Sequence, residues 1–185
     1  MRQNFDVSIN DYNRELFTEH KTVIEQREGE SPTHLMLKIL ALALYFEPKI
    51  LIEPSDVDPT FKPDLLVRAI DGFPKLWIEC GQVKTAKLDK LTNRYRDAKF
   101  VVVKRLEREI RDLCGRCEKE VRNPWILEYV GFDNDFVESV ARNIHGRNDL
   151  TAILSGDDLT VVINGFEYNS KVHRLDHGEK PYRGR

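Results

Sequence analysis

The chain has 185 residues, of which 41% are hydrophobic, and its 29 basic and 31 acidic side chains give a formal net charge of −2. This near-neutral balance excludes a histone-like or uniformly cationic nucleic-acid binder. No apolar run reaches the ~18 residues that a membrane-spanning helix requires, since the longest covers only residues 39–46. The first residues lack the apolar stretch of a signal peptide, and three cysteines give no disulfide framework, so we expect a cytoplasmic protein.

The first half of the chain predicts two strands, a buried helix and a hairpin. Alternating apolar and polar residues over 5–9 predict a strand, and residues 11–17 fit one or two helical turns. Ser31 and Pro32 predict the start of a helix, because Ser caps helix N-termini and Pro suits the first helical position, and Pro48 ends it. The other strands expected in this half are residues 22–26, 50–52, 65–70 and 75–80.

The second half predicts alternating helices and strands followed by a β-rich end. Helices are expected at residues 85–97, 106–121 and 133–144, and strands at residues 100–103, 125–130, 150–154, 159–163 and 166–172. This order predicts an α/β fold in which helices pack on a mixed sheet. We expect one domain over residues 1–175 and a flexible polar tail over residues 176–185.

The hairpin expected at residues 65–80 brings two carboxylates together. A register centred on a turn at residues 71–74 places Leu66 opposite Glu79 and makes Asp64 a diagonal neighbour of Glu79 on the same face. Their Cβ atoms would then lie somewhat under ~7–8 Å apart. Two carboxylates at this separation can share a hard divalent ion such as Mg²⁺. The alternative is a pair of solvated acids at the ends of two strands.

The residues around this hairpin resemble a known family. Lys62-Pro63-Asp64 and the later string Ile78-Glu79-Cys80-Gly81-Gln82 are similar to the signature of the PD-(D/E)XK nuclease superfamily. With Leu76-Trp77 before this string and Lys87-Leu88 after it, the resemblance becomes closest to the YaeQ family, a bacterial branch of that superfamily. It extends over nearly the whole chain. It implies a restriction-endonuclease-like core with N-terminal strands and a C-terminal β-rich extension.

The resemblance also implies roles for individual residues. In the superfamily, the two acids that correspond to Asp64 and Glu79 bind Mg²⁺, for which Mn²⁺ can substitute, and an acid near the first helix often completes the shell. Glu30 is the candidate for that third ligand. The Lys of the signature, which orients or activates the attacking water, is replaced here by Gly81. Three nearby side chains are candidates for its role: Gln82, Lys84 and Lys87.

The distribution of charge suggests a partner. Residues 84–124 hold 13 basic and 7 acidic side chains, whereas the rest of the chain is acidic. This basic band, with Lys87 and Arg94 on one helix face, predicts either ordinary solvated helices or a surface that contacts nucleic-acid phosphates. The resulting hypothesis is a Mg²⁺-dependent nuclease that hydrolyses phosphodiesters with a variant active site. The alternative is a catalytically inactive module of the same fold that binds nucleic acid or a protein.

Overall fold

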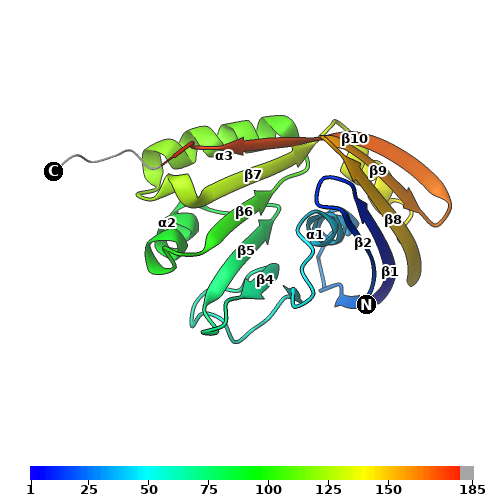
Figure 1. Ribbon diagram of the computed structural model, residues 1–185, viewed down its shortest axis with the longest axis horizontal. Coiled ribbons are helices and arrows are strands. Elements are labelled where there is room, and N and C mark those ends of the chain that lie inside the picture. Colours follow the sequence, from blue (N-terminus) through cyan, green and yellow to red (C-terminus); the bar gives the residue numbers. More distant parts are fainter. Residues whose placement is uncertain (180–185) are drawn as a thin grey trace.

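A ten-stranded mixed sheet is the framework of the protein in its computed structural model, which describes residues 1–179 (Figure 1). Across the sheet the strands are β2 (Leu16–Glu25), β1 (Arg2–Asp11), β8 (Arg147–Ser155), β9 (Asp158–Ile163), β10 (Phe166–Asp176), β7 (Leu127–Phe132), β6 (Lys99–Val103), β5 (Pro74–Cys80), β4 (Leu65–Arg68) and β3 (Leu51–Ile52). The helices are α1 (Pro32–Leu44), α2 (Thr85–Arg94), α3 (Glu107–Glu120), α4 (Phe136–Ala141) and the short 3-10 helix η1 (Pro124–Ile126). The predicted α/β class and mixed sheet are confirmed. Within residues 1–179, no helix is long and apolar enough to cross a membrane.

The N-terminal strands form a longer hairpin than predicted. Asp11 pairs with Leu16, so the prediction of helical turns at residues 11–17 is wrong. The physical reason lies in the Asp11 carboxylate, which accepts hydrogen bonds from the backbone N–H groups of Asn13 at 3.0 Å and Arg14 at 3.2 Å. An Asp side chain bonded in this way stabilises a tight turn.

Helix α1 lies inside the curve of the sheet, which nearly closes around it (Figure 1). Its N-terminus forms as predicted, since the Ser31 hydroxyl accepts a hydrogen bond from the His34 N–H at 3.1 Å and Pro32 is the first helical residue. All residues from 35 to 44 are buried, because β1, β4, β5, β8 and α4 surround the helix. A helix that is apolar all round belongs in a core, and Lys38 is the one charged residue in this stretch.

The Lys38 ammonium is buried among three carboxylates. Its side chain is only 1% exposed, and it donates hydrogen bonds to Glu30 and to Glu53, the latter at 2.7 Å. Asp64 Oδ1 lies 3.9 Å away. Burial by itself would lower the pKa of Lys38, but the hydrogen bonds and charges of these carboxylates raise it. Lys38 therefore remains a cation that ties α1 to the segments before β4.

Strands β4 and β5 form the predicted hairpin in a different register. Leu65 pairs with Ile78 and Leu66 with Trp77, so the prediction that Leu66 lies opposite Glu79 is wrong by two residues. The reason is a wider turn, which is preceded by an irregularity in β4 and closed by a hydrogen bond of 2.8 Å from the Ala69 N–H to the Phe73 carbonyl. A slip of two residues preserves the predicted faces within the paired strands. Asp64, which lies just before β4, instead directs its carboxylate toward α1, so the prediction that it shares a face with Glu79 is wrong.

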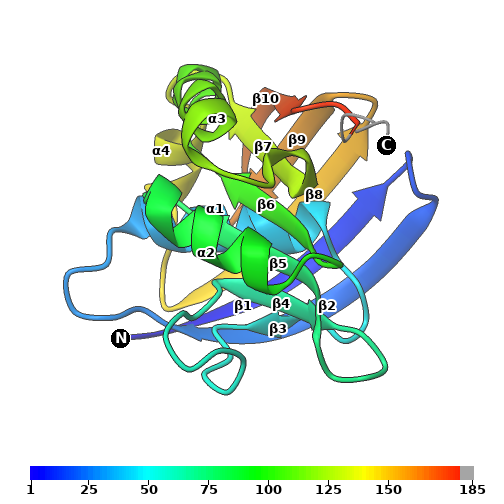
Figure 2. The same cartoon turned by 90° about the vertical axis from the view of Figure 1, so that its left-hand side faces the viewer.

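Strands β5, β6 and β7 are parallel and are connected through α2 and α3, which cover the outer face of the sheet (Figure 2). The predicted apolar stripes of these helices are buried there against Trp77, Phe100 and Tyr129. Two boundaries differ from prediction: α2 ends at Arg94, and β7 begins at Leu127 after η1. The predicted succession of helix, three strands, helix and strand is confirmed by α1, β3, β4, β5, α2 and β6.

Strand β10 joins the two halves of the sheet. Residues 166–171 pair with β9, and residues 172–176 pair with β7. Because β8 also pairs with β1, the C-terminal strands are continuous with the N-terminal hairpin rather than a separate extension. The first residue of the predicted tail, Asp176, still belongs to β10, and residues 180–185 lie outside the described part of the chain.

Asp133 helps to fix this junction. The helix predicted over residues 133–144 is shorter in the structure, where α4 begins only at Phe136 and ends at Ala141. The Asp133 carboxylate instead accepts a hydrogen bond from the Lys171 N–H at 2.9 Å and lies 2.7 Å from His173 Nε2. Its side chain therefore holds β10 where that strand passes from one neighbour to the next.

Replacement of Lys38 by Met should destabilise the protein by about 3–5 kcal/mol, because it leaves buried carboxylates without their counter-charge. Urea unfolding at neutral pH measures the loss. Lys21→Met is the matched control, since the Lys21 side chain is 80% exposed, and it should change the free energy of unfolding by less than about 0.5 kcal/mol. Equal effects of the two substitutions would contradict the assigned role of Lys38.

Candidate functional site

Asp64 and Glu79 meet where the β4–β5 hairpin opens. The pairing of Leu65 with Ile78, continued by one residue, places Asp64 directly opposite Glu79 instead of diagonal to it. The Asp64 N–H donates a hydrogen bond to the Ile78 carbonyl at 3.0 Å, so the strands are still paired at this point. The backbone thus brings both predicted acids to one end of the hairpin, while their side chains engage different partners.

The Asp64 carboxylate is directed toward α1. Its Oδ2 accepts a hydrogen bond from the Cys80 N–H at 2.7 Å, and its Oδ1 lies 3.7 Å from His34 Nε2 and 3.9 Å from Lys38 Nζ. Burial by itself would raise the pKa of Asp64, but His34, the Cys80 N–H and Lys38 lower it below its usual value. Asp64 is therefore held as an anion.

The Glu79 carboxylate is directed toward α2. It accepts hydrogen bonds from Trp77 Nε1 and Lys87 Nζ, each at 2.7 Å. Its side chain is 7% exposed, and burial raises the pKa of Glu79, with a further contribution from the charge of Asp64. Lys87 and Trp77 oppose this rise without cancelling it. Lys87, one of the three candidates for the role of the missing Lys, is therefore in contact with an acid of the site.

The backbone at Gly81 does not favour a side chain. Its φ is +78°, a conformation that L side chains rarely adopt, and a Cβ there would meet the His34 ring at 3.6 Å. A Lys at position 81 would be strained in this backbone. The other two candidates, Gln82 and Lys84, are exposed, and their side chains make no hydrogen bond to residues 1–179. Among the three candidates, Lys87 alone reaches the acid pair.

Glu30, the predicted third metal ligand, is engaged with cations. It binds Lys38, and its Oε1 lies 3.2 Å from His34 Nδ1. No group of three or more His, Cys, Asp or Glu side chains in the described chain is arranged to hold a metal ion. Lys38 and its partner Glu53 were not predicted as residues of this site. A signal for Lys38 was present, because a lone charge within an apolar helix must find a counter-charge when it is buried.

The basic band is mostly an ion-paired surface. Six of its 13 cations bind carboxylates: Lys87, Arg94, Lys99, Arg105, Arg111 and Arg122. Arg94, expected as a free cation beside Lys87, binds the buried Asp58. Although burial alone would raise the pKa of Asp58, its hydrogen bonds lower it to about 2, that from Arg94 contributing most. The exposed cations with no carboxylate partner in residues 1–179 are Lys84, Lys90, Arg96, Arg108, Arg116 and Lys119.

Comparison with known proteins places this arrangement in a family. The sequence profile described as "YaeQ protein" matches residues 2–172 of the chain. The chain belongs to the YaeQ family. The family-level resemblance carried by the string around Glu79 is thereby confirmed. No curated protein matches the chain.

Two solved structures of YaeQ proteins share the fold. The one from Pseudomonas syringae is 18% identical, with a TM-score of 0.80, and the similarity covers 97% of this chain and 97% of that chain. The one from Xanthomonas axonopodis pv. citri is 21% identical, with a TM-score of 0.77, covering 95% of this chain and 97% of that chain. The YaeQ fold therefore spans almost the whole protein, including the strands at both ends.

The two acids of this YaeQ-family protein should change its pH stability in opposite directions. Because the pKa of Asp64 is lowered by folding, its stabilising contribution is present above the usual value of 3.8 and is lost as the pH falls through the lowered pKa. Because the pKa of Glu79 is raised, stability is lost as the pH rises from 4.5 through the raised pKa.

Asp64→Asn should therefore destabilise the protein at pH 7, by on the order of 1–3 kcal/mol, whereas Glu79→Gln should be neutral or stabilising. Chemical unfolding between pH 3 and pH 8 measures both differences. Losses of equal size for the two variants at pH 7 would refute the assignment of opposite pKa shifts.

Proposed function

We propose that the protein is a nuclease-like phosphodiester hydrolase whose variant active site is built from Asp64, Glu79 and Lys87. The observation that carries this proposal is the contact of Lys87 with Glu79 at 2.7 Å, at the point where Glu79 stands opposite Asp64. A carboxylate pair with an adjacent ammonium is the set of groups that the PD-(D/E)XK resemblance implies. The ammonium comes from α2 because the backbone at Gly81 does not favour a side chain.

The acid pair suits a hard divalent ion better than the predicted trio. Mg²⁺ is commonly held by one or two carboxylates together with waters and substrate phosphates. Asp64 and Glu79 would hold it, whereas Glu30 is already bonded to Lys38. When bound, the ion supplies Lewis acidity and lowers the pKa of its water. Lys87 supplies a positive charge beside the pair, which stabilises the negative charge of a phosphate group.

The energetics of Glu79 favour a functional role. Its carboxylate is buried beside Trp77, and burial raises its pKa, so its negative charge is held at a cost to stability. Such perturbed groups cluster at active sites. A residue kept only for stability would be expected to show a lowered pKa, as Asp58 does.

A second candidate is a binding module of the same fold that has no turnover. The observation that favours it is charge compensation within the site. Lys38 neutralises Glu30 and Glu53 and lies near Asp64, and Lys87 neutralises Glu79. Carboxylates already paired with ammonium groups attract a divalent ion less strongly. In this candidate the exposed cations of α2 and α3 would hold a nucleic acid without cleaving it.

Cleavage assays separate the two candidates. With Mg²⁺ or Mn²⁺, the wild type should cut single-stranded or duplex DNA or RNA, and a chelator should abolish the activity. Asp64→Asn, Glu79→Gln and Lys87→Met should each lower kcat/KM by about 100-fold or more, as loss of one charge-stabilising group does. Lys21→Met, which replaces an exposed lysine on β2 outside the basic band, is the matched control and should retain activity.

Calorimetric titration of Mn²⁺ into the wild type and Asp64→Ala provides the second readout. The hydrolase proposal requires ion binding that Asp64→Ala removes. Nucleic-acid binding without cleavage and without ion binding would reject the hydrolase in favour of the binding module.

Binding to nucleic acid should depend on salt through the unpaired cations. If three or four of them contact phosphates, log Kobs for duplex DNA should fall with log salt with a slope of about −3 to −4. Reversal of charge at Lys84 and Lys90 should flatten the slope by about one to two units. Lys21→Glu on β2, at the edge of the sheet remote from α2, should leave it unchanged. A slope near zero for the wild type would exclude this surface as a phosphate contact.

A further inference from the structure

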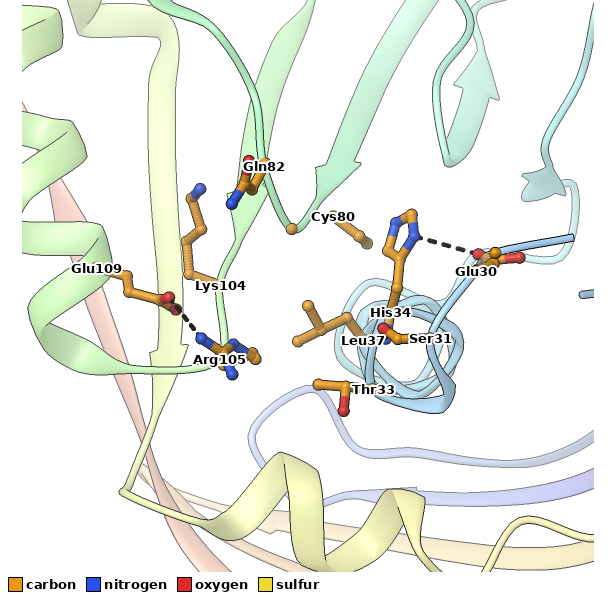
Figure 3. Close-up of a pocket in the computed structure, with 12 residues that line it drawn as sticks. Glu30, Ser31, Thr33, His34, Leu37, Cys80, Gln82, Lys104, Arg105 and Glu109 are labelled. Carbon is orange, nitrogen blue, oxygen red and sulfur yellow. Dashed lines mark hydrogen bonds and ion pairs between the residues drawn. The ribbon is translucent and has the colours of Figure 1, made fainter. Parts of the chain in front are cut away.

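A cleft of about 580 Å³ opens between the N-terminal turns of α1 and α3 (Figure 3). Its floor contains the residues that follow β5 and β6, which are adjacent parallel strands. Ligands of α/β proteins commonly bind beyond the carboxyl ends of parallel strands. The volume lies within the range of small-molecule sites. None of the groups proposed above for hydrolysis lines this cleft, although Cys80 and Gly81, which follow Glu79, do.

Lys104 is the unusual residue of the cleft. It follows β6 directly, and its backbone N–H is still bonded to the Val130 carbonyl at 2.8 Å, which fixes its position. The residue is 9% exposed, and within residues 1–179 its ammonium has no hydrogen bond and no ion pair. Burial lowers the pKa of Lys104 accordingly. A lysine that is mostly buried and has no ion-pair partner is costly, and an anion bound in the cleft that it lines would relieve that cost.

The acids that line the same cleft form no ion pair with Lys104, although the charge of Glu109 partly opposes the fall in the pKa of Lys104. Glu109 binds Arg105 at 3.1 Å and also accepts a hydrogen bond from the Leu106 N–H. Glu30 binds Lys38 on the other side of the cleft. Both carboxylates are already matched by cations, as the close-up shows for Arg105 with Glu109 (Figure 3). Lys104 is the cation that stays unmatched.

The first turn of α1 adds a second attractive element. Ser31 and Thr33 line the cleft, and the first turn contains no acidic residue. Helix N-termini carry a partial positive charge and attract anions. Gln82, exposed and unbonded within the described residues, adds an amide that can donate hydrogen bonds.

We propose that this cleft binds the phosphate group of a phosphate ester, with Lys104 as its counter-ion and the N-terminal turn of α1 and the Gln82 amide as further contacts. Phosphate fits because it combines high negative charge with several acceptor oxygens. The assignment of the ester to a nucleic-acid terminus rests on the function proposed above. The anion site itself rests on Lys104 and the cleft alone.

Inorganic phosphate is the first probe, titrated into the full chain and followed by calorimetry and thermal unfolding. It should bind to the wild type and raise its Tm. Lys104→Met should weaken phosphate binding by about 10- to 100-fold, as loss of a charged hydrogen-bond donor does. Without phosphate, the same variant should have an equal or higher Tm, so loss of binding cannot come from unfolding.

Lys49→Met is the matched control, because Lys49 is an exposed cation between α1 and β3 that has no carboxylate partner in residues 1–179 and lies outside the basic band and the cleft. It should bind phosphate like the wild type. Absence of phosphate binding to the wild type, or equal binding to Lys104→Met, would overturn the proposed site.

Oligonucleotides with a 5′-phosphate or a 5′-hydroxyl identify the source of the phosphate. Displacement of inorganic phosphate by the phosphorylated strand alone supports a terminal nucleic-acid phosphate as the ligand. Displacement by neither strand, with binding of inorganic phosphate still dependent on Lys104, supports the anion site and counts against the nucleic-acid function. The two proposals can therefore fail separately.

Discussion

The salt-bridge cluster around Lys38 is the interaction on which the rest of the structure depends. A helix enclosed by a curled sheet must be apolar, and α1 is apolar apart from this one ammonium. Lys38 gathers Glu30 from the segment before α1, Glu53 from the loop after β3 and Asp64 from the start of β4. The cluster thus joins three separate segments at one point. Asp64 is oriented toward α1 by this attraction and by the Cys80 N–H.

The acids on the two sides of the β4–β5 hairpin have pKa values shifted in opposite directions. On the inner side, Asp64 is stabilised as an anion by its surroundings, whereas on the outer side Glu79 remains in contact with Lys87 although burial raises its pKa. Gly81 lies between the hairpin and the cleft, and its lack of a side chain leaves space beside His34. Three features therefore meet near the end of β5: Asp64, whose surroundings favour its anion, Glu79, whose burial disfavours its anion, and Gly81, which has no side chain. This division allows a structural cluster and the acid proposed above for hydrolysis to share one hairpin.

The sequence predicted the helices and strands better than it predicted which charged side chains form ion pairs. The start of α1 followed from Ser31 and Pro32, whose local chemistry determines a helix N-terminus, whereas the shared face predicted for Asp64 and Glu79 was wrong because Asp64 turns toward Lys38 and His34 of α1. The register was missed by two residues because it depends on the width of a turn, which alternation does not encode. The partners of Lys38 could not be predicted, since Glu53 reaches it from a loop whose path is set by tertiary packing. For the same reason, the sequence did not indicate that cations of the basic band such as Arg94 and Arg122 pair with acids from distant segments.

The pairing of β1 with β8 has a consequence for how the protein folds during its synthesis on the ribosome. The N-terminal hairpin emerges first, but the strand that covers its inner edge begins at Arg147, and β10, which joins both halves, ends at Asp176. Until residues 147–155 have been synthesised, β1 presents an unpaired edge and apolar side chains that the finished sheet buries. Contacts between residues so distant in sequence form slowly, and exposed strand edges promote aggregation. The nascent chain should therefore be most vulnerable late in translation, and truncation within β10 should prevent folding rather than merely shorten the sheet.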